Sequence, residues 1–429
     1  MAELAGFPPR DIALLVIFAL MSGAVLVRPW LGVLALAFLS FFHPQGYAQG
    51  PVQQYPLVMT MFLITLAAAG KAAVFDQFRP RLTPLLDWRM LMIFALFGWF
   101  VITTVYSINH WAAWPYLWDV LKILPALVLV VVLIDTAEKL RALLFVIAIS
   151  IALVTLKGGY WAVMTGFHDR VYGPPHSQYG DNNEFAVAMV MSLPLLLLIL
   201  RESSTWRFSV AIICLVALTY IAVISSWSRG GLLAISIMSL LLAVQRARNL
   251  VLLAGVSGLI AVILVVLPAD WFTRMSTIVS YQGEGSALSR LAVWQLGMEA
   301  TADRPWLGGG FKSWIYSTLT TGSSMAWHSA YIQILTEHGY VGFLLWSALL
   351  GSTVLLGLLA PFRKPRVVNG TLPSMADPRD VQATLALALL GYLVGAVFLS
   401  IAYWELVYWL ITLAAISADL AGRKVPRGV

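Results

Sequence analysis

The sequence predicts an all-α polytopic membrane protein with about 12 transmembrane helices and one long polar loop. Of its 429 residues, 60% are hydrophobic and only 11% are charged, whereas a soluble domain has about 25% charged residues. Apolar runs of about 20 residues, the length that crosses a bilayer, follow one another along most of the chain. Many of the 17 Trp residues lie near the ends of these runs, where the membrane interface favours them.

Two of the apolar runs have unusual lengths. The run at 30–42 is short, so it forms a hairpin with the preceding run or is partly re-entrant. The run at 382–420 is long enough for two crossings, with a break near Tyr403. The runs divide the chain into 1–267 with about 10 transmembrane helices, a loop domain at 268–329, and the C-terminal helices and tail at 330–429.

Basic residues mark one face of the membrane. Five alternate loops and the C-terminal tail hold 16 of the 27 Lys and Arg residues, so we expect these six segments to be cytoplasmic. This distribution accounts for the net charge of +7 without nucleic acid as a partner. The single cysteine, Cys214, lies within an apolar run and can form no internal disulfide. The loops expected outside are 43–56, 107–117, 165–182, 227–229 and 268–329.

Two outer loops carry arginines that need an explanation. Arg170 opposes the positive-inside bias, so we expect an anionic partner, either a ligand phosphate or a nearby carboxylate such as Asp169. Arg229 lies in a very short turn, where it reaches lipid headgroups or points into a central cavity. Asn183 follows the loop of Arg170 directly. It is either a capping residue of the next helix or a secondary candidate for the site.

The long outer loop carries the third arginine. Residues 289–299 have helical periodicity, and Pro305 is expected to end that helix. Arg290 lies in this segment and either pairs with a surface carboxylate such as Glu299 or contacts a ligand. The triple glycine at 308–310 permits a tight, ligand-permissive loop.

A histidine stands where the long loop re-enters the membrane. Ionisable groups at membrane depth are costly and usually functional. His328, followed by Ser329, can be neutral at outside pH and accept a proton, because the ordinary pKa of histidine is about 6.5. His338 would lie about two to three turns deeper, where we expect it to pack or to support the site.

The outer residues fit one chemistry better than several others. The sequence has no Walker loop, no metal-ligand spacing and no G-x-S-x-G elbow, so we expect neither a metal nor a cofactor. Arginines suit the oxygens of a diphosphate, and a histidine can deprotonate a hydroxyl. This combination fits group transfer from a diphosphate to an alcohol, and it fits an anion transporter almost as well. The scarcity of ionisable residues deep in the spans, with Lys71, Lys122 and Glu405 as the main exceptions, favours surface chemistry.

The ordered motifs resemble those of the bacterial O-antigen ligase and polymerase superfamily. His328-Ser329, nine residues and then Gly339-Tyr340-Val341-Gly342 is similar to the ligase pattern H-[NSQ]-x9-G-x-x-G. Trp306 and Gly309 depart from the superfamily signature, which has aliphatic residues there. The other matching segments are Arg170-Val171-Tyr172-Gly173 with Asp181-Asn182-Asn183-Glu184-Phe185-Ala186, Ser228-Arg229-Gly230, Ser289-Arg290 with Trp294, and Arg304-Pro305-Trp306-Leu307-Gly308-Gly309-Gly310-Phe311.

The resemblance implies a metal-independent, inverting glycosyltransferase of the GT-C type in the bacterial inner membrane, with its site facing the periplasm. The donor would be an undecaprenyl diphosphate-linked glycan and the acceptor a hydroxyl of lipid A–core oligosaccharide, giving lipopolysaccharide. His328 would be the general base, and Arg290, Arg229 and, less directly, Arg170 would bind the diphosphate. The chain also resembles exosortase-associated O-glycosylation ligases, so the acceptor could be a protein. A polymerase and a flippase are the remaining alternatives.

Overall fold

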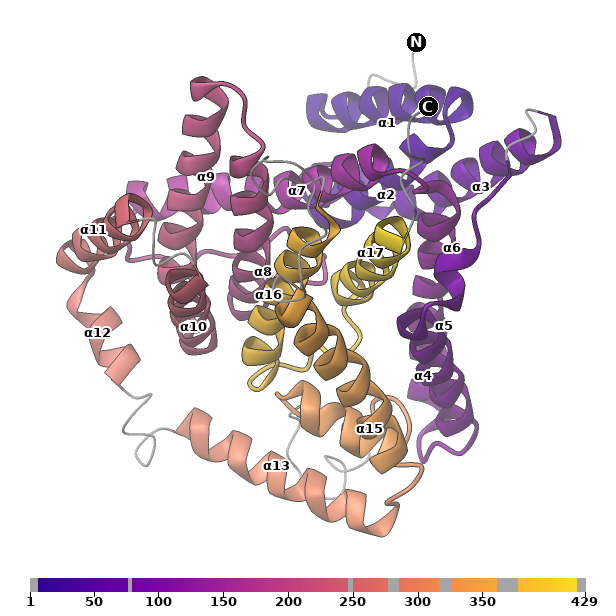
Figure 1. The fold of residues 1–429 in the computed structure, drawn as a ribbon. Helices are drawn as coiled ribbons and strands as arrows, with labels where there is room; N and C mark the ends of the chain where they lie inside the picture. The colour runs from indigo at the N-terminus through magenta and orange to yellow at the C-terminus, as the bar shows by residue number, and fades with distance from the viewer. Residues whose placement is uncertain are drawn as a thin grey trace.

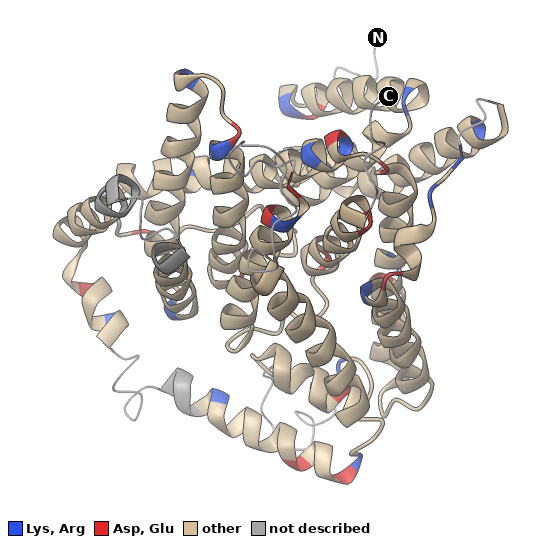
Figure 2. Cartoon of the chain, viewed as in Figure 1, with Lys and Arg blue, Asp and Glu red and all other residues tan. Residues whose placement is uncertain are grey.

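The computed structural model describes residues 7–75, 79–245, 250–276, 285–315, 326–360 and 377–422. Over these ranges the chain is helical, as predicted, and it forms no strand (Figure 1). Charged residues lie mostly near helix ends and in the connections between helices (Figure 2). The α-helices are α1 (Pro9–Val27), α2 (Trp30–Phe41), α3 (Leu57–Phe75), α4 (Trp88–Val105), α5 (His110–Leu121), α6 (Ile123–Leu133), α7 (Ala137–Met164), α8 (Asn182–Arg201), α9 (Trp206–Ser225), α10 (Arg229–Gln245), α11 (Leu250–Val266), α12 (Ala269–Ser276), α13 (Gly285–Asp303), α15 (Ala330–Leu359), α16 (Pro378–Ala396) and α17 (Glu405–Gly422).

The described residues contain nine helices that are long and apolar enough to cross a membrane. The number rises to ten if the bent pair of α11 and α12 forms one span, so the expected 12 stays a prediction. The last apolar run is divided into α16 and α17, and the break includes Tyr403 as expected. The short run at 30–42 becomes the 12-residue helix α2.

One expected loop is wrong. Residues 107–117 do not form an open connection, because α5 already begins at His110. The side chain of Asn109 caps this helix by accepting a hydrogen bond from the backbone N–H of Ala112, at 3.3 Å. The helix α5 continues across Lys122 into α6, and together they form one candidate span, His110–Leu133.

The centre of the protein is built around α8 and α16. The buried helix α8 packs against α7, α9, α10 and α16, and α16 also packs against α15 (Figure 1). Glycines in α16 permit this close approach, since a Cβ at Gly395 would lie 2.3 Å from the side chain of Val187 in α8. Because α8, α10 and α15 all pack on α16, the segments that precede them can meet at one end of the bundle.

The segment that follows α2 is held by a buried carboxylate. Two short 3-10 helices, η2 (Pro44–Tyr47) and η3 (Pro51–Gln54), form this segment. Asp11 of α1 is fully buried and accepts hydrogen bonds from the backbone N–H groups of Gln49, Gly50 and Val52, at 2.8 to 3.2 Å. These bonds offset the cost of burying a carboxylate and fix the segment against α1.

The described part of the long polar region contains the helices α12 and α13. The amphipathic helix α12 turns away from the end of α11 by 110°. The expected helix at 289–299 is part of α13, which ends at Asp303, two residues before Pro305, as predicted. Helix α13 lies alongside the first half of α15 (Figure 1). This contact carries Arg290 towards the segment that leads into α15.

Candidate functional site

His328 occupies a tight corner just before α15. Its φ of 48° places it in the left-handed region, which is uncommon for a residue other than glycine. Its neighbour Trp327 is fully buried, and the backbone carbonyl of Trp327 accepts a hydrogen bond from the indole N–H of Trp294, at 2.9 Å. The half-buried imidazole is therefore held on an anchored and strained turn, a feature that often accompanies functional sites.

Arg290 lies on the side of α13 that faces α15. Arg290, Trp294 and Gly297 follow one another at intervals of four and three residues, so they share one helix face. A Cβ at Gly297 would lie 2.8 Å from Ile332 of α15, which shows that this face is in close contact with α15. One turn before Trp294, Arg290 is thereby brought to the corner of His328.

The charge of Arg290 affects the pKa of His328. Burial lowers the pKa of His328 below its ordinary value, and the positive charge of Arg290 lowers it further. The carboxylate of Asp181 acts in the opposite direction. The imidazole is therefore neutral at pH 7 and available as a proton acceptor.

A second cluster joins the turn of Arg229 to the loop of Arg170. The backbone N–H of Val171 donates to the carbonyl of Ser225 at 3.1 Å, and the side-chain amide of Asn182 donates to the carbonyl of Ser226 at 2.6 Å. Arg229 is half-buried at the start of α10. Arg170 is exposed, and within the described ranges neither Asp169 nor Asp181 forms an ion pair with it.

Asp181 and the end of α16 connect the two clusters. Asp181 caps α8 by accepting from the N–H of Asn183 at 2.9 Å, and its charge also reaches His328. The hydroxyl of Tyr331, near the start of α15, donates to the carbonyl of Leu393 in α16 at 3.0 Å. Just beyond α16, Phe398 packs against the turn of Arg229, since a Cβ at Gly230 would lie 3.3 Å from its ring. The segments that carry Arg229, Arg290 and His328 therefore lie around the same end of α16.

The glycine-rich segment after α13 docks on a kink in α15. The N–H of Gly309 donates to the carbonyl of Thr336, and the N–H of Gly310 donates to the carbonyl of Glu337, both at 2.8 Å. In return, the N–H of Tyr340 donates to the carbonyl of Pro305 at 2.7 Å. Gly339 forms the kink with a φ of 66°, and a Cβ there would lie 2.3 Å from the carbonyl oxygen of Trp306.

Two family models match parts of the chain. Residues 213–347, which include Arg229, Arg290, His328 and both glycines of the G-x-x-G pattern, match the family model described as O-antigen ligase. Over these residues the chain is similar to the O-antigen ligase family. Residues 9–197 match a second model, described as a family of unknown function (DUF5935). No curated protein matches the chain.

The geometry gives the family's glycine pattern a physical reason. Gly339 permits the kink and the close backbone contact with the docked segment. Gly342 leaves room for the preceding turn, because a Cβ there would lie 2.4 Å from the Cβ of His338. Trp306 contributes its backbone to this contact while its side chain is 67% exposed, so the departure from the signature at this position leaves the docking intact. The triple glycine therefore serves this docking.

His338 differs from His328 because it is fully buried in a hydrogen-bonded chain. Its Nδ1 lies 2.6 Å from the hydroxyl of Thr103, and its Nε2 lies 2.9 Å from the hydroxyl of Tyr403. Tyr403 donates to Glu337 at 2.5 Å, and the other oxygen of Glu337 accepts from the N–H of Lys312 at 3.0 Å. His338 thus packs at the base of the docked loop, as expected for a supporting residue.

Sequence reasoning missed several members of these contacts. Asn182 joins the loop of Arg170 to the turn of Arg229, and Glu337 and Tyr403 tie α15 to the break before α17. The only sequence signal for Glu337 is its position beside His338 in an apolar run. Of the secondary candidates, Ser329 is buried and makes no side-chain cap for α15, while Asn183 hydrogen-bonds to Asp181.

Replacing Gly339 by alanine tests the docking contact. The added Cβ would strain a left-handed residue and collide with the backbone of Trp306, so we expect Gly339→Ala to destabilise the protein by at least about 2 kcal/mol. Gly351→Ala in the same helix is the matched control, because a Cβ there meets nothing within 4 Å. Thermal unfolding of both purified variants checks this, and equal midpoints would contradict it.

Proposed function

We propose that this protein is an O-antigen ligase that moves a glycan from undecaprenyl diphosphate to a hydroxyl of lipid A–core oligosaccharide. The observation that carries the proposal is the nearness of the cation Arg290 to the neutral, half-buried His328, within the region that is similar to the O-antigen ligase family. The chain is a multi-pass membrane protein. We propose that it resides in the bacterial inner membrane with this site facing the periplasm.

In the proposed reaction, His328 acts as the general base. The acceptor hydroxyl attacks the anomeric carbon of the donor sugar, and the bond from that carbon to the diphosphate oxygen breaks. The proton of the hydroxyl passes to the imidazole. Attack opposite the leaving diphosphate inverts the configuration at the anomeric carbon. The lowered pKa of His328 supports this role because it keeps the imidazole unprotonated at pH 7.

The arginines act on the leaving group in this mechanism. Arg290 and Arg229 would bind the diphosphate oxygens and stabilise the charge that develops as the bond breaks. Arg170 is exposed on the loop tied to the Arg229 turn, so we propose that it contributes to donor binding and not to bond breaking. The mechanism uses the positive charge of the arginines where other enzymes use a metal ion.

Product analysis distinguishes the proposed ligase from its alternatives. A ligase produces glycan-modified lipid A–core from the two purified lipids. A polymerase instead lengthens the carrier-linked glycan, and a protein O-glycosylation ligase modifies a polypeptide. A flippase or anion transporter changes the leaflet of the donor without exchanging a bond.

We expect His328→Ala to lower glycan transfer by roughly 100- to 10,000-fold, because the acceptor hydroxyl loses its base. The measurement is product formation by protein reconstituted with the diphosphate-linked donor and lipid A–core. His168→Ala is a control, since His168 is exposed in the outer loop of Arg170. Transfer at the wild-type rate by a folded His328→Ala variant would contradict the assignment.

The pH dependence of transfer should follow the charges around His328. Arg290→Gln removes a positive charge and raises the pKa of His328, so the loss of rate at acid pH should begin at higher pH. Asp181→Asn removes a negative charge and should shift the same limb to lower pH, while asparagine keeps the cap of α8. Residual transfer rates measured between about pH 4 and 8, around the ordinary histidine pKa, test both shifts. Identical acid limbs in the two variants would contradict the proposal.

A further inference from the structure

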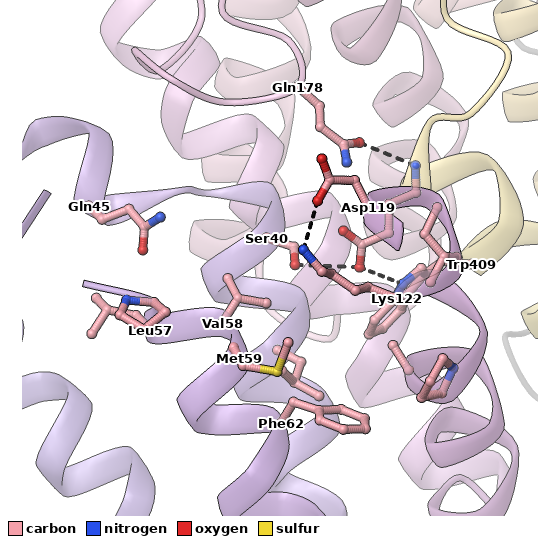
Figure 3. Close-up of a pocket in the computed structure, with 16 residues that line it drawn as sticks. Ser40, Gln45, Leu57, Val58, Met59, Phe62, Asp119, Lys122, Gln178 and Trp409 are labelled. Atoms are coloured by element: carbon pink, nitrogen blue, oxygen red, sulfur yellow. Dashed lines mark hydrogen bonds and ion pairs between the residues drawn. The ribbon is translucent and has the colours of Figure 1, made fainter. Parts of the chain in front are cut away.

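A pocket lies apart from the corner of His328. It has a volume of about 380 Å³ and is bounded by α2, α3, the junction of α5 with α6, and the start of α17 (Figure 3). The outer segments add Gln45 and Gln178 to its lining. On the orientation expected from the basic loops, these parts lie at the outer membrane interface. The reaction proposed above makes no use of this pocket.

An ion pair projects into this pocket from a candidate span. Asp119 and Lys122 lie 2.7 Å apart within His110–Leu133. Their side chains are 66% and 56% exposed. Charges in a membrane segment normally face a protein interior or a polar cavity. A ligand in this pocket must therefore be polar where it contacts Asp119 and Lys122.

The remaining polar groups include two kinds of acceptor, a carboxyl group and an amide oxygen. Glu405 accepts from the indole N–H of Trp409 at 2.9 Å and lies 3.5 Å from the hydroxyl of Ser40. Among the described residues, no donor reaches the buried Oε1 of Gln45, an atom that needs a partner when water is excluded. The pocket lining thus offers two carboxyl groups and a free amide oxygen against one ammonium group.

The apolar part of the lining lies on α3. Leu57, Val58, Met59 and Phe62 form this side, and Met59 is 41% exposed. Figure 3 shows these side chains below the polar groups. A ligand in the pocket would therefore have a polar end near Lys122 and an apolar end along α3. This division is that of a membrane lipid.

We propose that the pocket binds the phosphoethanolamine headgroup of a phospholipid. The headgroup ammonium would donate hydrogen bonds to Asp119, Glu405 and Gln45, and the phosphate would contact Lys122. The acyl chains would follow the apolar side of α3. An anionic headgroup meets an excess of carboxyl groups, and a choline headgroup has no N–H to donate, so both fit less well. This inference is independent of glycan transfer.

The test is lipid retention by the purified full-length protein. Phospholipids with identical acyl chains and ethanolamine, choline or glycerol headgroups are added, together with a neutral glucosyl diacylglycerol. Bound lipid is then measured by native mass spectrometry. We expect the ethanolamine lipid to be retained about tenfold more than the choline lipid, which corresponds to one well-placed hydrogen bond to charge. Asp119→Asn and Gln45→Leu should reduce this preference at least about threefold, a partial loss of the same bonds.

Asp135→Asn is the matched control, because Asp135 lies between α6 and α7, pairs with Lys139 of α7 at 2.6 Å and is outside the pocket lining. It should keep the ethanolamine preference. Thermal unfolding of each variant shows whether the fold is retained, and Asp119→Asn is the main test because Asp119 is exposed. Four outcomes would overturn the proposal: equal retention of all lipids, preference for the glycerol headgroup, preference for the glucosyl lipid, or an unchanged preference in Asp119→Asn.

Discussion

The candidate site depends on the backbone contact between the glycine-rich segment and the kink of α15. Three backbone hydrogen bonds, from Gly309, Gly310 and Tyr340, join the two segments. These bonds fix the end of α13 beside the kink of α15, while Trp294 fixes the earlier part of α13 beside Trp327. With two attachments, α13 cannot rotate about its axis, and the face that carries Arg290 stays directed towards His328.

The two histidines near this contact divide structural and chemical roles. His338 is enclosed by Thr103 and Tyr403, so its ring is occupied at both nitrogens and helps to hold α15 to the break before α17. His328 lies on a left-handed turn, and its environment sets the proton balance: burial and Arg290 lower its pKa, and Asp181 opposes them. The loop that ends at Asp181 and the long polar region that carries Arg290 thus act on one imidazole. The proposed glycan transfer would use both halves of this arrangement, a stable base and a nearby cation.

Much of the fold could be predicted from local sequence patterns. Apolar runs identified most of the helices, and periodicity with Pro305 identified α13 and its end. His328 and Arg290 stood out because charged groups are rare in this chain. The helix α5 was missed because its aromatic first turns resemble an interfacial loop. The roles of Asn182, Glu337 and Tyr403 could not be predicted, because their partners lie 44 to 66 residues away and only the packed structure brings them together.

Donor binding by the two single variants tests the central claim most directly. His328 is assigned as the base and Arg290 as the diphosphate contact. Loss of His328 should therefore impair the chemical step, and loss of Arg290 should impair donor binding. Affinity for an undecaprenyl diphosphate-linked glycan is measured with purified wild-type, His328→Ala and Arg290→Ala proteins. We predict that His328→Ala binds the donor as tightly as the wild type and that Arg290→Ala binds it at least about tenfold more weakly, the effect of one lost charge-assisted contact. Wild-type affinity in Arg290→Ala would contradict the account.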